Sequence, residues 1–350
     1  MGRGSLQPLV AKKEEAASSP KGNTLALAAG TLVMSLTLAS EWICTKTGLI
    51  GAPKLLFASH SSDARAMVIY VIYEVARCCG THLGSFLILS GLRDRFSLLK
   101  DAKARSVLAR SVMNISFLGA CGYRGLEMWR AMAESKWPSS VNQLSEALMS
   151  KSSSLSWVPS TAYARLYGYY PDFQRLAAVM AAFQLKNTLD TLYYKDGWLF
   201  LLHHVIVVVV AYCALHPFAH FHGTFFFGVS ETSTTLLALL ANFDKDHGLP
   251  ALERDYPNVR TSIGALFALS FLVVRGILWP YFSFFFIRDC LKVLKDNQAH
   301  DTVVVQGYII MLATLSLMQI LWLTQIAQAI YAEVFEPLFS KGKKTTKKID

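Results

Sequence analysis

The sequence predicts an all-α, polytopic membrane protein with about eight transmembrane helices. Of its 350 residues, 53% are hydrophobic and only 17% are charged, whereas soluble domains carry roughly 25% charged residues. The apolar residues also form continuous runs, such as residues 198–215 and 262–287, and roughly 20 mostly apolar residues are enough to span a bilayer. These observations exclude a soluble enzyme, a nucleic-acid-binding module and a disordered regulator.

The predicted segments follow one another in a simple order. A polar cytosolic tail, residues 1–23, precedes two N-terminal helices within residues 24–99 and a helical domain of about six helices, residues 100–335; a basic cytosolic tail, residues 336–350, ends the chain. The predicted spans are residues 24–44, 66–92, 106–123, 176–194, 198–215, 221–243, 259–287 and 303–331. The polar stretch 126–172 is predicted to be a lumenal loop.

The net charge of +10 indicates topology rather than a nucleic-acid partner. Basic residues gather in the N-terminal tail, between Arg93 and Arg110, and in the last ten residues, where lysine and arginine favour the cytosolic side. Eight spans with a cytosolic N-terminus place all these groups in the cytosol. Seven spans, with residues 66–92 or 106–123 not crossing, would invert the N-terminal part.

The chain ends in a pattern that predicts in which cellular membrane the protein is located. Lys347 and Lys348 are fourth and third from the carboxyl end, and this spacing resembles the dilysine retrieval signal of endoplasmic-reticulum membrane proteins. We therefore expect a multi-pass protein of the endoplasmic reticulum membrane with a cytosolic C-terminus. The alternative is a basic juxtamembrane tail whose spacing is accidental.

Charged residues within the predicted spans need partners, because one charge at a helix centre costs about 2.5–3.5 kcal/mol on insertion scales. Lys186 and Asp190 are spaced i,i+4, and Glu74 and Arg77 are spaced i,i+3, so each pair shares a helix face. Arg275 has no such neighbour. We expect it to pair with Glu231 or a lipid headgroup, and Pro280 to kink its helix.

The candidate site combines His203 and His204 with the segment GVSETST, residues 228–234, on the next helix. Adjacent histidines point about 100° apart on a helix, whereas a shared metal ion needs an i,i+4 pair, so we predict no metal site. One imidazole beside Glu231 would form an acid–base dyad. The alternative, which the residue types alone favour, is a buried polar network that joins two helices.

These motifs resemble the TLC domain, the family of the ceramide synthases, the translocation-associated TRAM proteins and smaller proteins of lipid homeostasis. Besides LLHH and its acidic-hydroxylic partner helix, the similar stretches are RLYGYYPDFQRLAAVMAAFQLKNTLDTLYY, FLVVRGILWPYF and AKARSVLARSVMNISF, within about residues 100–335. Phe183 and Asn187 stand where the family often has Tyr and Asp, and Asn114 stands where His is common.

The resemblance implies a barrel-like bundle around a lipid-accessible cavity. Ceramide synthases carry H-D-x-x-D-x-x-x-E after the histidine pair, and here those positions are Ser230, Glu231, Thr234 and Ala238. Only the acid at the second position of this motif is kept, as Glu231, and E-T-S-T looks closer to the E-x-S-T-P of the smaller, non-synthase members. The resemblance thus implies a role in lipid homeostasis, namely control of the acyl composition of sphingolipids or phospholipids. The alternative is an acyl-CoA-dependent N-acyltransferase acting on a sphingoid base.

The predicted site follows from these two hypotheses. Under the enzyme alternative, the catalytic residues would be His203, His204 and Glu231. The predicted substrate-binding residues are Lys186, Asn187, Asp190, Ser230, Ser233, Thr234 and Arg275. No cofactor is expected, and acyl-CoA enters only as a co-substrate of the enzyme alternative. The expected partners are the lipid bilayer and its lipids, and a homo-oligomer is compatible with such a bundle. A transporter or channel is a third hypothesis, for which the sequence lacks the paired broken helices typical of many transporters.

Overall fold

The computed structural model describes residues 64–134, 159–244 and 248–332, and in these residues the regular structure is entirely helical. Each span predicted after residue 63 falls on a helix, whereas the predicted first span, residues 24–44, lies outside the described residues. By length and composition, three described helices are apolar enough to cross a membrane: His220–Phe243, Pro257–Lys295 and Thr302–Ile330. The predicted all-α, polytopic membrane class is confirmed.

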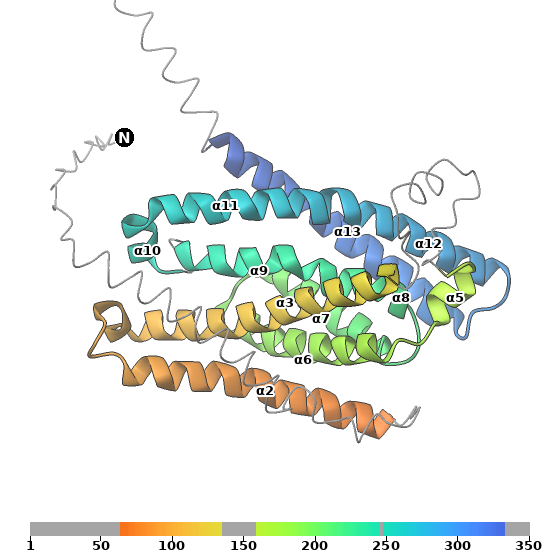
Figure 1. Ribbon diagram of the computed structural model, residues 1–350, viewed down its shortest axis with the longest axis horizontal. Coiled ribbons are helices and arrows are strands. Elements are labelled where there is room, and N and C mark those ends of the chain that lie inside the picture. Colours follow the sequence, from red (N-terminus) through yellow and green to blue (C-terminus); the bar gives the residue numbers. More distant parts are fainter. Residues whose placement is uncertain (1–63, 135–158, 245–247, 333–350) are drawn as a thin grey trace, which may run out of the picture.

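The long helices lie side by side as a bundle (Figure 1). The main elements are α2 (Ala64–Gly91), α3 (Ala102–Glu134), α5 (Ala162–Tyr167), α6 (Pro171–Tyr194), α7 (Trp198–Cys213), α8 (His220–Gly223), α9 (Glu231–Leu240), α10 (Pro250–Asp255), α11 (Pro257–Phe271), α12 (Trp279–Lys295) and α13 (Thr302–Ile330). Helix α3 packs against α2 and α9, α6 packs against α7 and α2, and α12 packs against α13 and α5. The α2–α3 connection and α10 lie at one end of the bundle, and α5 lies at the other.

The boundaries predicted for the loop at residues 126–172 are wrong. Helix α3 continues to Glu134, and α5 and α6 begin before residue 172. The segment after Leu126, EMWRAMAE, holds no glycine or proline and consists mostly of good helix formers, so nothing in it ends the helix. The middle of the predicted loop, residues 135–158, lies outside the described residues.

Two wide helical turns interrupt the C-terminal half of the bundle. The π-helical turn η3 (Thr224–Val229) joins α8 to α9, and the π-helical turn η5 (Leu272–Leu278) joins α11 to α12. Pro280 follows η5, lacks a backbone N–H and cannot bond to the Gly276 carbonyl four residues earlier. The kink expected at Pro280 stays a prediction, and the irregularity that the structure has before this proline is the wide turn, a form often found at functional sites.

A pair of glycines lets α3 and η3 approach to backbone contact. A Cβ atom on Gly228 would lie 2.5 Å from the Cα atom of Gly125, so neither position has room for a side chain. Around this contact the bundle core is aromatic, and Phe117, Phe173 and Phe225 are almost fully buried. The contact fixes η3, and therefore the start of α9, against the N-terminal half of the bundle.

Candidate functional site

A cavity lies between α6, α7, the η3–α9 segment, the η5–α12 segment and α13. It contains about 670 Å³ of space free of protein atoms, part of which is open to the surroundings. Its wall is mostly apolar and aromatic, with Phe173, Val207, Phe226, Phe227, Trp279 and Leu312 among the lining residues. The polar residues of the wall are Gln184, His203, His222, Glu231, Arg275 and Tyr308.

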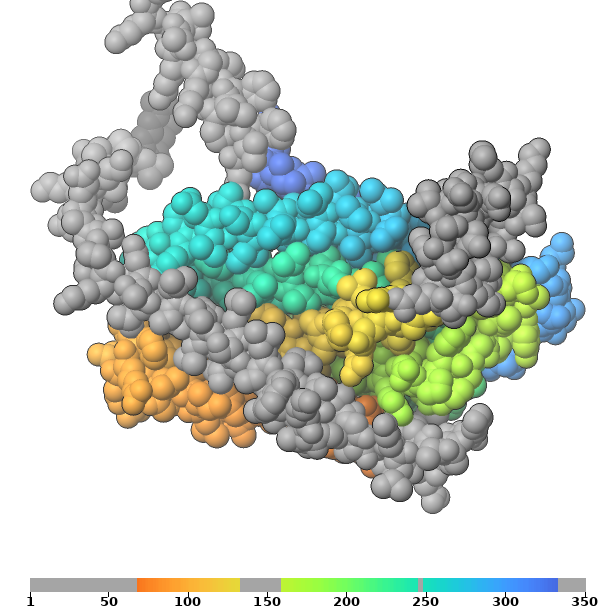
Figure 2. Space-filling view, in the orientation of Figure 1, coloured from red at the N-terminus to blue at the C-terminus, as the bar shows by residue number. Residues whose placement is uncertain are grey.

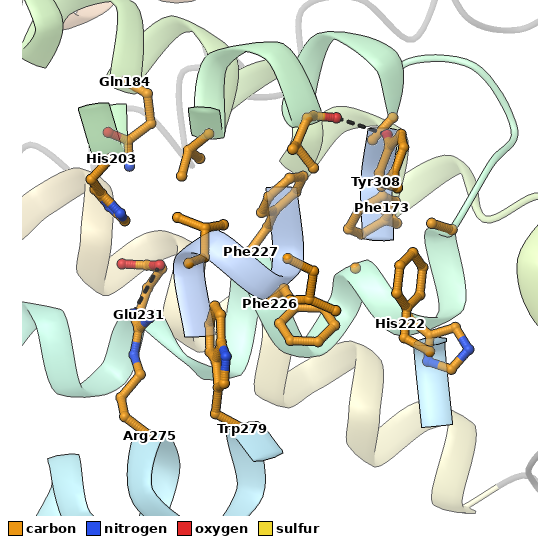
Figure 3. A pocket seen from close by; sticks show the side chains of 18 residues that line it. Phe173, Gln184, His203, His222, Phe226, Phe227, Glu231, Arg275, Trp279 and Tyr308 are labelled. Atoms are coloured by element: carbon orange, nitrogen blue, oxygen red, sulfur yellow. Dashed lines mark hydrogen bonds and ion pairs between the residues drawn. The ribbon is translucent and has the colours of Figure 1, made fainter. Parts of the chain in front are cut away.

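Arg275 and Glu231 form an ion pair at one end of the cavity (Figure 3). Arg275 Nη2 lies 3.4 Å from Glu231 Oε1, and it also donates to Thr234 Oγ1 at 2.9 Å and to the Ser230 carbonyl at 3.2 Å. The guanidinium stands over the Trp279 ring, 4.9 Å from its centroid. The partner predicted for Arg275 is confirmed as Glu231. Both side chains are buried, so each compensates the charge of the other in an apolar wall.

The two adjacent histidines face different surroundings, as the period of the helix predicts. His203 lines the cavity, and its Nδ1 atom is buried and has no hydrogen-bond partner in the part of the chain that the structure describes. His204 lies outside the cavity lining and donates from Nδ1 to Gln184 Oε1 on α6, at 2.5 Å. Since an amide oxygen only accepts, this contact fixes the proton of His204 on Nδ1. His203 is therefore the histidine of this pair that faces the cavity.

Lys186 and Asp190 belong to a separate polar cluster between α2, α3 and α6. The predicted Lys186–Asp190 ion pair is confirmed, and Lys186 Nζ also donates to His82 Nδ1 at 2.7 Å. Arg110 lies 3.6 Å from Asp190 and donates to Asp196 at 2.5 Å. This cluster lies near the end of the bundle that holds the α2–α3 connection. The Glu74–Arg77 pair on α2 is likewise confirmed, at 2.7 Å.

The remaining predicted residues sit beside the cavity rather than in its wall. The hydroxyls of Ser230 and Ser233 donate to backbone carbonyls of their own helix, and that of Thr234 accepts from Arg275. Asn187 lies outside the cavity lining, and its Oδ1 atom is buried with no hydrogen-bond partner among residues 64–134, 159–244 and 248–332. Of the predicted site residues, the structure thus brings His203, Glu231 and Arg275 together on the cavity.

A second polar group at the cavity was not predicted from the sequence. His222 lines the wall, is 2% exposed, and places Nε2 3.1 Å from Asp289 Oδ2. Arg165 from α5 grips the same carboxylate through two hydrogen bonds of 2.6 Å. Two sequence features could have indicated this polar group: the pair of histidines in HFH, residues 220–222, and the arginine of RLYGYY, residues 165–170.

The segment around α5 is fastened to the bundle by further polar contacts. The Tyr170 backbone N–H donates to His220 Nδ1 at 3.1 Å, and Tyr167 Oη lies 2.9 Å from His300 Nδ1. Burial raises the pKa of both tyrosine phenols, so both hydroxyls stay neutral near pH 7. His220 differs from His222 in its hydrogen bonds, because both ring nitrogens of His220 bond to backbone groups.

The comparison with known proteins identifies a family domain in the part of the chain that forms the cavity. The TLC-domain family model matches residues 135–328, a range that contains every residue of the cavity wall. No curated protein and no solved structure matches the chain. The family match extends over more than half of the sequence and agrees with the helical fold and its apolar spans. The chain therefore belongs to the TLC-domain family of multi-pass membrane proteins, a family connected with lipid metabolism or sensing.

Proposed function

We propose that the protein binds a lipid chain in this cavity and acts in lipid homeostasis of the endoplasmic reticulum membrane, on sphingolipid or phospholipid acyl composition. The observation that carries the proposal is the buried, mainly aromatic and aliphatic wall, in which the Glu231–Arg275 pair is already neutralised. Such a wall favours an acyl chain over a charged solute, because transfer of apolar surface from water is favourable. Lys347 and Lys348 support the choice of membrane, which microscopy of the tagged full-length chain would test.

Filling the cavity is expected to displace the lipid. Val207 lines the wall and is 6% exposed, so Val207→Phe adds volume where a bound chain would lie. The full-length protein, purified in mild detergent, is analysed by mass spectrometry for co-purified lipid, and the variant should retain much less than the wild type. The matched control is Val209→Phe on the same helix, since Val209 is 44% exposed on another face.

Three readouts decide this experiment. The control variant should keep its lipid, and both variants should elute as monodisperse species with a similar melting temperature. A wild-type protein without bound lipid, or equal lipid retention in a folded Val207→Phe variant, would contradict the proposal.

A second candidate function is N-acyl transfer from acyl-CoA to a sphingoid base. The observation that favours it is the Nδ1 atom of His203, which has no hydrogen-bond partner among the described residues and belongs to the same wall as Glu231, because a neutral imidazole nitrogen can accept a proton from a reacting amine. On this hypothesis the amine attacks the thioester carbonyl, the amide C–N bond forms, the C–S bond breaks and CoA leaves as its thiol.

Release of CoA tests this candidate directly. Purified protein given acyl-CoA and a long-chain base should release CoA, and His203→Ala should reduce release more than His204→Ala, since only His203 faces the cavity. Absence of CoA release from the wild type, or release unchanged in His203→Ala, would eliminate the candidate and leave the lipid-binding proposal intact.

A further inference from the structure

The cavity has a second polar group, at His222, that lies away from the Glu231–Arg275 pair (Figure 3). We propose that His222 Nδ1 is a hydrogen-bond acceptor for the hydroxyl group of a long-chain lipid. This inference rests on the proposed lipid-binding function and deepens it, because it assigns a polar subsite and a class of ligand to the cavity.

The tautomer of His222 follows from its contact with Asp289. A carboxylate only accepts hydrogen bonds, and Asp289 Oδ2 lies 3.1 Å from His222 Nε2. The imidazole proton is therefore on Nε2. Arg165 grips both carboxylate oxygens of Asp289, so the charge of the carboxylate is balanced without a positive imidazole. A neutral His222 with its proton on Nε2 leaves Nδ1 as a lone-pair acceptor.

Nδ1 of His222 is an acceptor whose partner is missing. Within the described residues the atom is buried and has no hydrogen-bond partner, and the residue is only 2% exposed. A buried acceptor without a partner costs about 1–3 kcal/mol, so a ligand that supplies a donor gains from a group that is already desolvated. The other polar atom of this wall region, the Tyr308 hydroxyl, already donates to the Val210 carbonyl at 2.9 Å.

The surroundings of His222 select a neutral donor. Phe286 and Phe221 stand edge-on to the imidazole at centroid distances of 5.2 and 5.3 Å, which excludes water from two sides. Arg165 and Arg288 both lie near the Asp289 carboxylate, at 2.6 and 3.7 Å, so a cationic headgroup would meet positive charge there. An anion would find no donor on Nδ1. A hydroxyl group satisfies the acceptor without bringing charge into the wall.

Two substitutions separate this role from simple structural support. His222→Gln can place its amide nitrogen where Nε2 donates to Asp289, but leaves no acceptor at the position of Nδ1. His222→Asn can place its amide oxygen near the position of Nδ1, and lacks the reach to Asp289. The first variant removes the proposed acceptor and keeps the ion-pair network, whereas the second restores an acceptor.

The experiment compares two probes of equal chain length, hexadecanol and its methyl ether, on the full-length purified protein. Both fill an apolar cavity, but only the alcohol has a hydroxyl donor. The wild type should bind the alcohol about five- to tenfold more tightly than the ether, the effect of one net hydrogen bond. His222→Gln should abolish this preference by weakening alcohol binding alone, and His222→Asn should recover part of it.

The outcomes distinguish the inference from the function on which it rests. Absence of binding for both probes by the wild type would overturn the proposed lipid-binding function as well. Binding of both probes with equal affinity, or a preference for the alcohol that persists in a folded His222→Gln variant, would overturn the inference alone. An equal loss of both probes in His222→Gln would show a structural role and would also overturn it.

Discussion

Replacing Asp289 with alanine is expected to lower the free energy of unfolding by about 3–5 kcal/mol, the effect of removing one partner from a buried ion pair. Asp289 is 1% exposed and accepts two hydrogen bonds from Arg165 and one from His222. Without the carboxylate, the Arg165 guanidinium keeps its charge in a mostly buried position, and among the described residues it then retains the hydrogen bond to the Pro159 carbonyl at 2.6 Å.

The matched control is an exposed ion pair of the same residue types. Asp172 and Arg175 lie 3.4 Å apart at the start of α6, and the Asp172 side chain is 76% exposed, so Asp172→Ala should cost no more than about 1 kcal/mol. Denaturant unfolding of the purified proteins in detergent measures both changes. Similar losses for the two variants would show that the Arg165–Asp289 pair does not fasten α5 to α12.

Replacing Gly228 with alanine is expected to destabilise the bundle by about 1–3 kcal/mol, the usual cost of overpacking, or to prevent recovery of folded protein. The new Cβ atom would lie 2.5 Å from the Cα atom of Gly125. This neighbour is backbone and cannot rotate away as a side chain can, so α3 and η3 must separate. Because α9 follows η3 directly, the separation would also displace Glu231.

Gly119→Ala is the control, since Gly119 lies on the same helix as Gly125. A Cβ atom there would be 3.8 Å from the Thr235 Cγ2 atom, which is an ordinary van der Waals contact, and alanine favours the helix. Gly119→Ala should therefore be neutral or stabilising in thermal unfolding followed by size-exclusion chromatography. Equal melting temperatures for Gly228→Ala and the wild type would contradict the close approach of α3 and η3.

Features that depend on one helix, or on a charge that must be neutralised, were predictable from the sequence. The spacing of Lys186 and Asp190 placed both on one face whatever surrounds them, and the structure has that ion pair. The period of the helix also separated His203 from His204. Glu231 could be predicted as a partner of Arg275 because a buried charge is costly in an apolar span.

Features that depend on packing between distant segments were not predictable. Arg165 and Asp289 are 124 positions apart, and nothing in the sequence around either residue points to the other. Only the packing of α5 against α12 brings them together and orients His222. The end of α3 was misplaced for another reason, because the polarity of the segment after Leu126 resembles that of a loop although its residues favour a helix.

The π-helical turn η5 has a consequence for how evolution can tune this cavity. A π turn holds one residue more than the α-helical turn that it replaces, so the residues after η5 are offset by one helical step, about 100°. The helix from Pro257 to Lys295 therefore consists of two segments whose faces are offset by this fixed angle, joined by the turn that contains Arg275. Substitutions in α11 can change its exposed face while α12 keeps Trp279 and Phe286 in the cavity wall.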